Sequence, residues 1–388
     1  MDEFGLSSAQ IDSAGAHWTA REILQQPQIW QEIQELIAGD ARVRAFLAPL
    51  LRQPDIRILL TGAGTSAFIG ECLAPALARK SARRVEAIST TDLVASPPSW
   101  LNTDTPTLLV SFARSGNSPE SVAALEIADA AVKHCSHLIL TCNAEGALYR
   151  RAQSLPNAHC ILLPEASNDR SFAMTSSFTG MLLAAAAAFG ILPADRGRTA
   201  ALGLLARQVI PGCLPLLQDL VRRGFERAVY LGSKELKGLA REAALKMLEL
   251  TDGKVVATAD APLGFRHGPK TILNRNTLVV VFLCSDPYSR RYDLDLLNEL
   301  RRDAVAGHVI ALSNSADLPR HPDNVVLDAA PAAADDSDLA LCLPYAVFAQ
   351  GLAMLRSISL GCSPDNPNPA GTVSRVVQGV SIYPLDPV

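Results

Sequence analysis

The sequence predicts an α/β protein made of two similar halves, each built around a mainly parallel sheet. Two observations lead to this prediction. Short runs rich in Val, Leu and Ile alternate with longer helical patterns through most of the 388 residues, as is typical of βαβ units. Several of these runs also recur at a nearly constant separation, which indicates an internal repeat.

Three pairs of apolar runs carry the repeat. The run that ends at Gly62 has a counterpart that ends at Gly232, and Thr107–Phe112 matches Thr277–Phe282; both separations are 170 residues. A third run, His137–Asn143, has its counterpart 171 positions later. A nearly constant separation is hard to obtain by chance, so a duplicated α/β domain is the simplest explanation.

The repeat divides the chain into three parts. Residues 1–39 form an N-terminal extension with two helical stretches, which is too short to be a domain and should pack on the core. Residues 40–215 form the first half and residues 216–388 the second, with Pro211–Pro215 near the join. In the C-terminal tail, Ser363–Thr372 has closely spaced prolines and cannot be helical.

Composition disfavours several classes of function. A formal net charge of -4 gives no large positive field, so nucleic acid and anionic membranes are poor partners. The most apolar stretch, Met181–Leu192, is shorter than the ~20 residues of a membrane span and predicts a buried helix. The eight cysteines lack metal-site or disulfide spacing, and the N-terminus lacks a secretory pattern. We expect a cytoplasmic protein with free thiols, no metal and a small-molecule partner.

The first strand of the repeat runs into a glycine-rich loop, Gly62–Ser66, and then into a helical pattern. Glycines let the backbone approach a ligand closely, and a helix N-terminus offers unpaired N–H groups to an anion. Gly64, Thr65 and Ser66 are therefore candidate phosphate ligands; a dinucleotide fingerprint and a plain tight turn are the alternatives. The fingerprint expects an acidic residue that ends the second strand, whereas Glu86 lies inside it.

A second loop, Ala113–Glu120, follows the next strand of the same half. The guanidinium of Arg114 can form a bidentate charge-assisted pair with a phosphate, and the hydroxyls of Ser115 and Ser118 can donate to the remaining oxygens. A helix cap at Ser118 is the alternative, and both roles are compatible because a capped helix start also binds anions. The candidate phosphate ligands of this loop are Arg114, Ser115, Gly116, Asn117 and Ser118.

These two loops resemble the signature of SIS (sugar isomerase) domains, through Thr61–Ser66 and Ser111–Ser121. The resemblance implies two tandem doubly wound, flavodoxin-like domains in which loop hydroxyls bind the phosphate of a sugar. By position, these hydroxyls are those of Thr65, Ser66, Ser115 and Ser118. The glucosamine-6-phosphate synthase branch has Ser-Gln where this chain has Ala113 and Arg114, so phosphate recognition should depend more on the arginine.

A helical run in the second half places Glu242, Lys246 and Glu249 at i, i+4 and i+7, on one face. A solvated, salt-bridged face is the alternative without function. Aldose–ketose interconversion needs a carboxylate that moves a proton between C2 and C1 and a positive group near the developing oxyanion. His267, in a loop next to Gly268, is the candidate for ring opening because imidazole titrates near neutrality; a structural histidine is the alternative.

Longer segments are similar to the tagatose-6-phosphate ketose/aldose isomerase group, and the similarity covers nearly the whole chain. They are Arg21–Pro27, Asn168–Thr179, Ser233–Thr251, Leu263–Lys270 and the Asn-Pro-Asn-Pro tail. The similarity implies that Glu249 is the proton shuttle and that His267 opens the ring. The synthase branch uses a tail lysine near its sugar carbonyl, but here Lys270 is the last lysine. Plain enolisation, without a cofactor, therefore remains.

We expect conversion of galactosamine 6-phosphate to tagatose 6-phosphate and ammonia. The alternatives are isomerisation without deamination, a non-catalytic regulator that senses a sugar phosphate, and a dinucleotide-dependent dehydrogenase. In related tandem enzymes the histidine loop reaches a neighbour's site, so at least a homodimer is expected.

Overall fold

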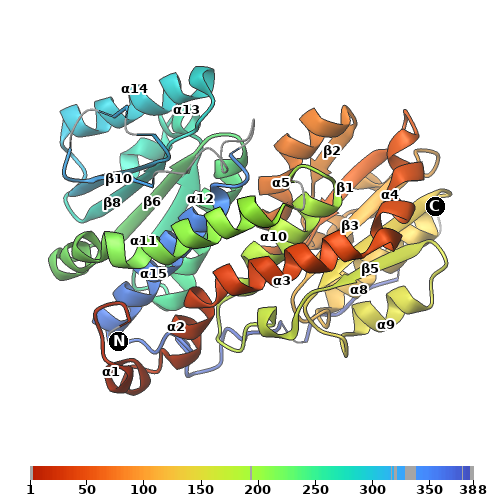
Figure 1. The fold of residues 1–388 in the computed structure, drawn as a ribbon, viewed down its shortest axis with the longest axis horizontal. Helices are drawn as coiled ribbons and strands as arrows, with labels where there is room; N and C mark the ends of the chain where they lie inside the picture. Colours follow the sequence, from red (N-terminus) through yellow and green to blue (C-terminus); the bar gives the residue numbers. More distant parts are fainter. Residues whose placement is uncertain are drawn as a thin grey trace.

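The computed structural model describes residues 3–192, 195–315, 317–318, 321–327, 338–377 and 379–384. Two five-stranded sheets form its core, and every paired strand runs parallel (Figure 1). The first sheet has the order β2-β1-β3-β4-β5 and the second β7-β6-β8-β9-β10, so both share the order 2-1-3-4-5. The predicted pair of doubly wound sheets is confirmed.

The strands have the following bounds: β1 (Arg57–Thr61), β2 (Arg84–Ala87), β3 (Thr107–Ala113), β4 (Cys135–Thr141), β5 (Ala158–Leu162), β6 (Arg227–Gly232), β7 (Val256–Asp260), β8 (Thr277–Phe282), β9 (His308–Ser313) and β10 (Asn324–Val326). The three strand pairs of the sequence repeat are β1 with β6, β3 with β8 and β4 with β9. The turn after β1 also recurs after β6: Gly64 has φ +55° and Lys234 has φ +54°.

The helices before and within the first half are α1 (Ser8–Ser13), α2 (His17–Leu24), α3 (Gln26–Gly39), α4 (Ala41–Arg52), α5 (Thr65–Ser81), α6 (Thr90–Ala95), α7 (Pro97–Trp100), α8 (Pro119–Ala131), α9 (Ala147–Gln153), the 3₁₀ turn η1 (Glu165–Ser167) and α10 (Ser176–Ala188). Those that follow are α11 (Arg196–Arg223), α12 (Glu235–Leu250), α13 (Pro262–Phe265), η2 (Pro269–Ile272), α14 (Pro287–Asp303) and α15 (Cys342–Ser359).

The N-terminal extension packs on the core, as expected. Trp30 of α3 is fully buried, and its indole N–H donates to the hydroxyl of Thr179 in α10 at 3.0 Å. The apolar helix α10 is itself buried along nearly its whole length. The extension therefore covers an apolar surface of the first half.

The expected boundary at residue 215 falls inside α11, which continues through Pro211 and Pro215. Both prolines lie on the exposed side of the helix, while its other side packs against α3 and α15. Burial of that side can offset the ~3 kcal/mol cost of a proline within a helix. The prolines therefore do not end the helix, and the division of the chain at this point remains a proposal.

Among the described residues, α11 is the one helix with the length and mean hydropathy of a membrane span, and 44% of the apolar window is buried inside the protein. Partial burial against α3 and α15 is also what a core helix shows.

Helix α5 of the first half and helix α12 of the second half pack antiparallel against each other between the two sheets (Figure 1). Along the pair, Lys246 of α12 contacts Thr65 at the start of α5, and Glu235 at the start of α12 contacts Arg79 near the end of α5. Gly238 permits this approach, since a Cβ there would lie 2.6 Å from the backbone nitrogen of Cys72. The C-terminal end of α12 consequently lies at the carboxyl end of the first sheet.

Candidate active site

The two predicted phosphate loops start from neighbouring strands. β1 and β3 are paired, with Thr61 in register with Ser111, and the loops 62–66 and 114–118 follow at their carboxyl ends. Loops at this edge of an open α/β sheet flank its ligand-binding crevice. The structure therefore brings together the two loops that the sequence singled out.

The first loop begins α5. Gly64 is the residue before the helix and needs a positive φ, which glycine adopts without strain. Thr65 and Ser66 follow in the first helical turn and are largely buried. The hydroxyl oxygen of Thr65 accepts a hydrogen bond from Lys246 Nζ at 2.9 Å, so this loop is in direct contact with α12.

The second loop is held by hydrogen bonds of its own. Ser118 caps α8 as predicted, and its hydroxyl oxygen accepts from the backbone N–H of Ser121 at 3.3 Å. The side-chain oxygen of Asn117 accepts from the backbone N–H of Ala147 at the start of α9. Asn117 therefore fixes the loop with its side chain, whereas Ser115 remains half-buried with its hydroxyl near the loop backbone.

Arg114 is almost completely buried and only partly satisfied. Its Nη2 donates to the backbone carbonyl of Arg375 at 3.0 Å, while Nε and Nη1 have no partner among the described residues. The hydroxyls of Thr61 and Ser111, at the ends of the adjacent strands, are likewise buried and unpartnered. Each such group costs about 1–3 kcal/mol when unsatisfied. An anion with several acceptor oxygens would satisfy the guanidinium.

The three charged residues of α12 meet on one face, as the helical spacing predicted. Lys246 Nζ lies 2.5 Å from Glu249 Oε2 and 3.5 Å from Glu242 Oε1. Lys246 and Glu242 are each 1% exposed, while the Glu249 side chain retains 26%. The alternative of a solvated ion-pair face is therefore wrong for this helix.

The surroundings of Glu242 and Lys246 give the two side chains different charge states near neutral pH. Burial raises the pKa of Glu242 to about 8; the charge of Glu249 adds to this rise, and Lys246 opposes it. Burial acts against the charge of Lys246, but the carboxylates of Glu242 and Glu249 outweigh it and raise its pKa. Near neutral pH the cluster thus contains a mostly neutral Glu242 beside a charged Lys246.

The structure does not bring His267 to this cluster within one chain. His267 is exposed and follows β7 and α13 at the carboxyl end of the second sheet. Glu249 is in the last turn of α12, which begins at that end and runs about 24 Å away from it at 1.5 Å per residue. In Figure 1, α13 lies at the outer end of the second half, away from α5.

Sequence reasoning missed the tail residue Arg375 and the buried carboxylate of Asp169. Asp169 accepts hydrogen bonds from the backbone N–H groups of Thr175, Ser176 and Ser177 and so fixes the start of α10. Its own carbonyl accepts a hydrogen bond from the guanidinium of Arg375. Asp169 lies in a segment that the family resemblance covers, whereas the aperiodic tail offers no signal for Arg375.

Comparison with known proteins identifies the family. The SIS domain family matches residues 50–190. The D-galactosamine-6-phosphate deaminase AgaS of Escherichia coli O157:H7 is 45% identical over 96% of this chain and 97% of its own length. The chain belongs to the AgaS family. A further AgaS, from Shewanella sp. (strain ANA-3), is 43% identical over 98% of this chain and 95% of its own.

A solved structure also resembles this chain in its fold. The tagatose-6-phosphate ketose/aldose isomerase from Escherichia coli has a TM-score of 0.83 and 41% identity, and the match covers 95% of this chain and 96% of that one. In the described part of this AgaS-family chain, no group of three or more His, Cys, Asp or Glu side chains is arranged to hold a metal ion. All eight cysteines are free thiols.

Proposed function

We propose that this chain is an enzyme that converts galactosamine 6-phosphate and water to tagatose 6-phosphate and ammonia. One contact carries the proposal: Lys246 donates to Thr65 of the phosphate loop and pairs with Glu249 of the acid/base helix. This contact supports the proposal because it joins a cation and a carboxylate to the loop that we expect to bind the phosphate. The AgaS relatives are named D-galactosamine-6-phosphate deaminases.

The phosphate binds at the carboxyl end of the first sheet. Arg114 supplies two nitrogens without a partner among the described residues, Nε and Nη1, and Thr65, Ser66, Ser115 and Ser118 supply hydroxyls. Charge-assisted bonds from a buried guanidinium are stronger than those between neutral groups. The phosphate therefore fixes the sugar with its reacting carbons towards Glu249 and Lys246.

Proton transfer then occurs at Glu249. In the open-chain aldehyde, its carboxylate takes the proton from C2, and the electrons of that C–H bond form an enolamine while negative charge develops on O1. The ammonium of Lys246 stabilises that charge. A proton from the substrate's own ammonium neutralises O1, and Glu249 then returns its proton to C1, which leaves an iminium (protonated imine) at C2. Water adds to this iminium, and ammonia departs to give the ketose.

We place ring opening on His267 from a second copy of the chain, because Glu249 and His267 lie at opposite ends of α12 within one copy. The smallest assembly that completes the site is then a homodimer. A reducing compartment suits eight free cysteines, so the cytoplasm is the proposed location.

The test measures ammonia and ketose from galactosamine 6-phosphate, with galactose 6-phosphate and glucosamine 6-phosphate as the matched substrates. We expect equal amounts of ammonia and tagatose 6-phosphate from the first. Faster conversion of galactose 6-phosphate, without ammonia from the amino sugar, would instead establish the isomerase. Tight binding without any turnover would establish a sugar-phosphate sensor.

A further inference from the structure

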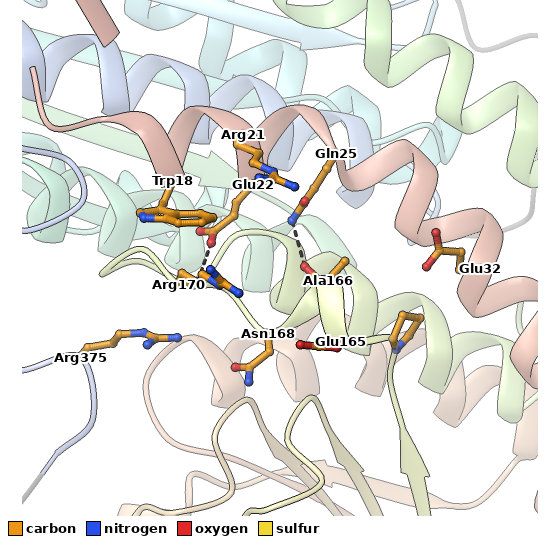
Figure 2. A pocket seen from close by; sticks show the side chains of 11 residues that line it. Trp18, Arg21, Glu22, Gln25, Glu32, Glu165, Ala166, Asn168, Arg170 and Arg375 are labelled. Carbon is orange, nitrogen blue, oxygen red and sulfur yellow. Dashed lines mark hydrogen bonds between the residues drawn. The ribbon is translucent and has the colours of Figure 1, made fainter. Parts of the chain in front are cut away.

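A second cavity lies beside the proposed sugar site but is not lined by its residues (Figure 2). Its volume of 630 Å³ lies within the ~300–1,000 Å³ of small-molecule pockets. The N-terminal helices, the segment that follows β5 and the C-terminal tail form its walls. Neither α12 nor the two phosphate loops contribute a lining residue.

One end of this cavity is cationic. Arg170 and Arg375 line it, and neither forms an ion pair with a described residue, whereas Arg21 of α2 lines the cavity beside Gln25, away from Arg375 (Figure 2). The guanidinium carbons of Arg170 and Arg21 lie 4.6 Å and 5.7 Å from the ring centroid of Trp18, which holds both groups by cation–π contact. Arg375 is anchored by its hydrogen bond to the carbonyl of Asp169.

The opposite end is acidic. Figure 2 shows Glu32 and Glu165 on the side of the cavity away from Arg375 and Arg170. Neither carboxylate forms an ion pair with a described cation, so charges of opposite sign face one another across the cavity without touching. Between the two ends lie the side-chain amides of Gln25 and Asn168, which can hydrogen-bond to hydroxyls.

Glu22 also lines the cationic end, but its oxygens are already used. They accept hydrogen bonds from the backbone N–H groups of Arg170 and Ser171 and from the Ser171 hydroxyl. Burial and the charge of Asp169 raise the pKa of Glu22 to about 7. Near neutral pH it cancels less than one of the two arginine charges at this end.

We propose that this cavity is an accessory, non-catalytic site for an amino-sugar phosphate, with the phosphate at Arg170 and Arg375 and the ammonium at Glu165. A phosphate has three free oxygens and up to two charges, which suits two guanidinium groups better than a carboxylate does. The naming of an amino sugar rests on the proposed function. The existence of a second binding site goes beyond it.

Arg375 couples the accessory site to the sugar site. Its guanidinium lines the cavity, while its backbone carbonyl accepts a hydrogen bond from Arg114 in the phosphate loop. A ligand that holds the guanidinium of Arg375 also holds that carbonyl, and with it the orientation of Arg114. The coupling between two sites is reciprocal, so a ligand in either site changes binding in the other by the same factor.

Calorimetric titration of the full chain tests the proposal with two ligands that carry no carbonyl and cannot be enolised. These are galactosaminitol 6-phosphate and galactitol 6-phosphate, which lacks the ammonium. We expect two equivalents per chain for the first ligand and one for the second. Arg170→Gln should remove one equivalent and leave the other, whereas Arg114→Ala should do the converse.

Glu165→Gln should weaken the accessory equivalent of galactosaminitol 6-phosphate at least about tenfold, because it removes the charge that faces the ammonium. Arg375→Gln provides a second variant of the cationic end, and thermal unfolding checks that each variant is folded.

One equivalent per chain for both ligands, or a second equivalent that persists in Arg170→Gln, would overturn the accessory site. Equally tight binding of 6-aminohexanoate, which has a carboxylate in place of the phosphate, would overturn the assigned ligand class. The proposed function fails by a different result, namely the absence of ammonia in the turnover assay, which requires no accessory site.

Discussion

Lys246 links polar groups from two different helices. Because it is buried between Glu242, Glu249 and Thr65, its charge is balanced inside the protein and held at a fixed position. Loss of either carboxylate therefore changes the electrostatics of the whole cluster. This interdependence decides how single substitutions in the site should be interpreted.

Arg114→Ala should raise KM for the sugar phosphate by about 10- to 100-fold, which corresponds to the roughly 1.5–3 kcal/mol of a hydrogen bond to a charged group. The value of kcat should change much less, because the guanidinium binds the phosphate in the ground state and in the transition state alike. Steady-state kinetics measure both. Arg44→Ala, at an exposed position of α4, is the control, and an unchanged KM in Arg114→Ala would remove Arg114 from the phosphate site.

Glu249→Gln should lower kcat by about 10²–10⁴-fold, the usual effect of losing a general base, while binding changes little. Exchange of C1–H with solvent deuterium should be lost in parallel. Glu242→Gln is the matched control on the same helix face and should retain measurable exchange, since Gln resembles the neutral form of that buried carboxyl. Wild-type exchange in Glu249→Gln would place the proton shuttle elsewhere.

Glu242 should also make stability depend on pH. Its pKa is raised from 4.5 to about 8 in the folded protein, so the folded state binds more protons than the unfolded state between these values. Its contribution is fully present below about pH 4.5 and is lost as the pH rises through about 8. Glu242→Gln does not titrate. We therefore expect the variant to gain stability relative to wild type as the pH rises over this interval.

Chemical unfolding at several pH values measures this difference. Glu145→Gln, at an exposed position before α9, is the control. A stability difference between Glu242→Gln and wild type that stays constant with pH would contradict the raised pKa.

Periodicity explains which site residues the sequence could locate. Glu242, Lys246 and Glu249 follow a helical spacing, and Arg114 follows directly after a strand, so local rules place them. Arg375 belongs to a tail without any period, and its carbonyl meets Arg114 through packing between segments 261 residues apart. Only the folded chain shows such a contact.

At the scale of elements, the packing of α5 against α12 brings the proposed phosphate loop next to the proposed acid/base residues. The strand repeat predicted both sheets, but it gave no information on which helices meet between them. That contact depends on Gly238, which a sequence pattern shows only as a glycine inside a helix. The same limit applies to α11, where Pro211 and Pro215 suggested a boundary but lie on the exposed side of a continuous helix.

Gly238→Ala should destabilise the protein by about 1–3 kcal/mol, because the added methyl group would approach the backbone of Cys72 too closely. Separation of α12 from α5 should also weaken the Lys246–Thr65 contact and reduce turnover. Gly212→Ala in α11 is the matched control, since no atom lies within 4 Å of the added carbon and alanine favours a helix interior. Equal unfolding midpoints for the two variants would show that the helices can separate without cost.

At the scale of the whole molecule, the two halves have divided their roles. The first half carries the proposed phosphate loops and the second carries the proposed acid/base helix, and the main apolar core contains residues of both, such as Ile69 and Leu239. The halves are thus joined by burial as well as by the site. His267 is the one proposed catalytic residue that this arrangement leaves outside the site.

If His267 acts on the site of a second copy, two inactive variants should restore each other. In a mixed dimer of Glu249→Gln and His267→Ala chains, one site combines both defects, while the other combines the intact Glu249 of one chain with the intact His267 of the other. Random reassembly of equal amounts makes half of the dimers mixed, so about a quarter of wild-type activity should return. Refolding the two variants together and separately, then assaying ammonia release, measures this recovery. If His267 instead served its own chain, every site in the mixture would carry one defect, and activity would not exceed the average of the two separate variants.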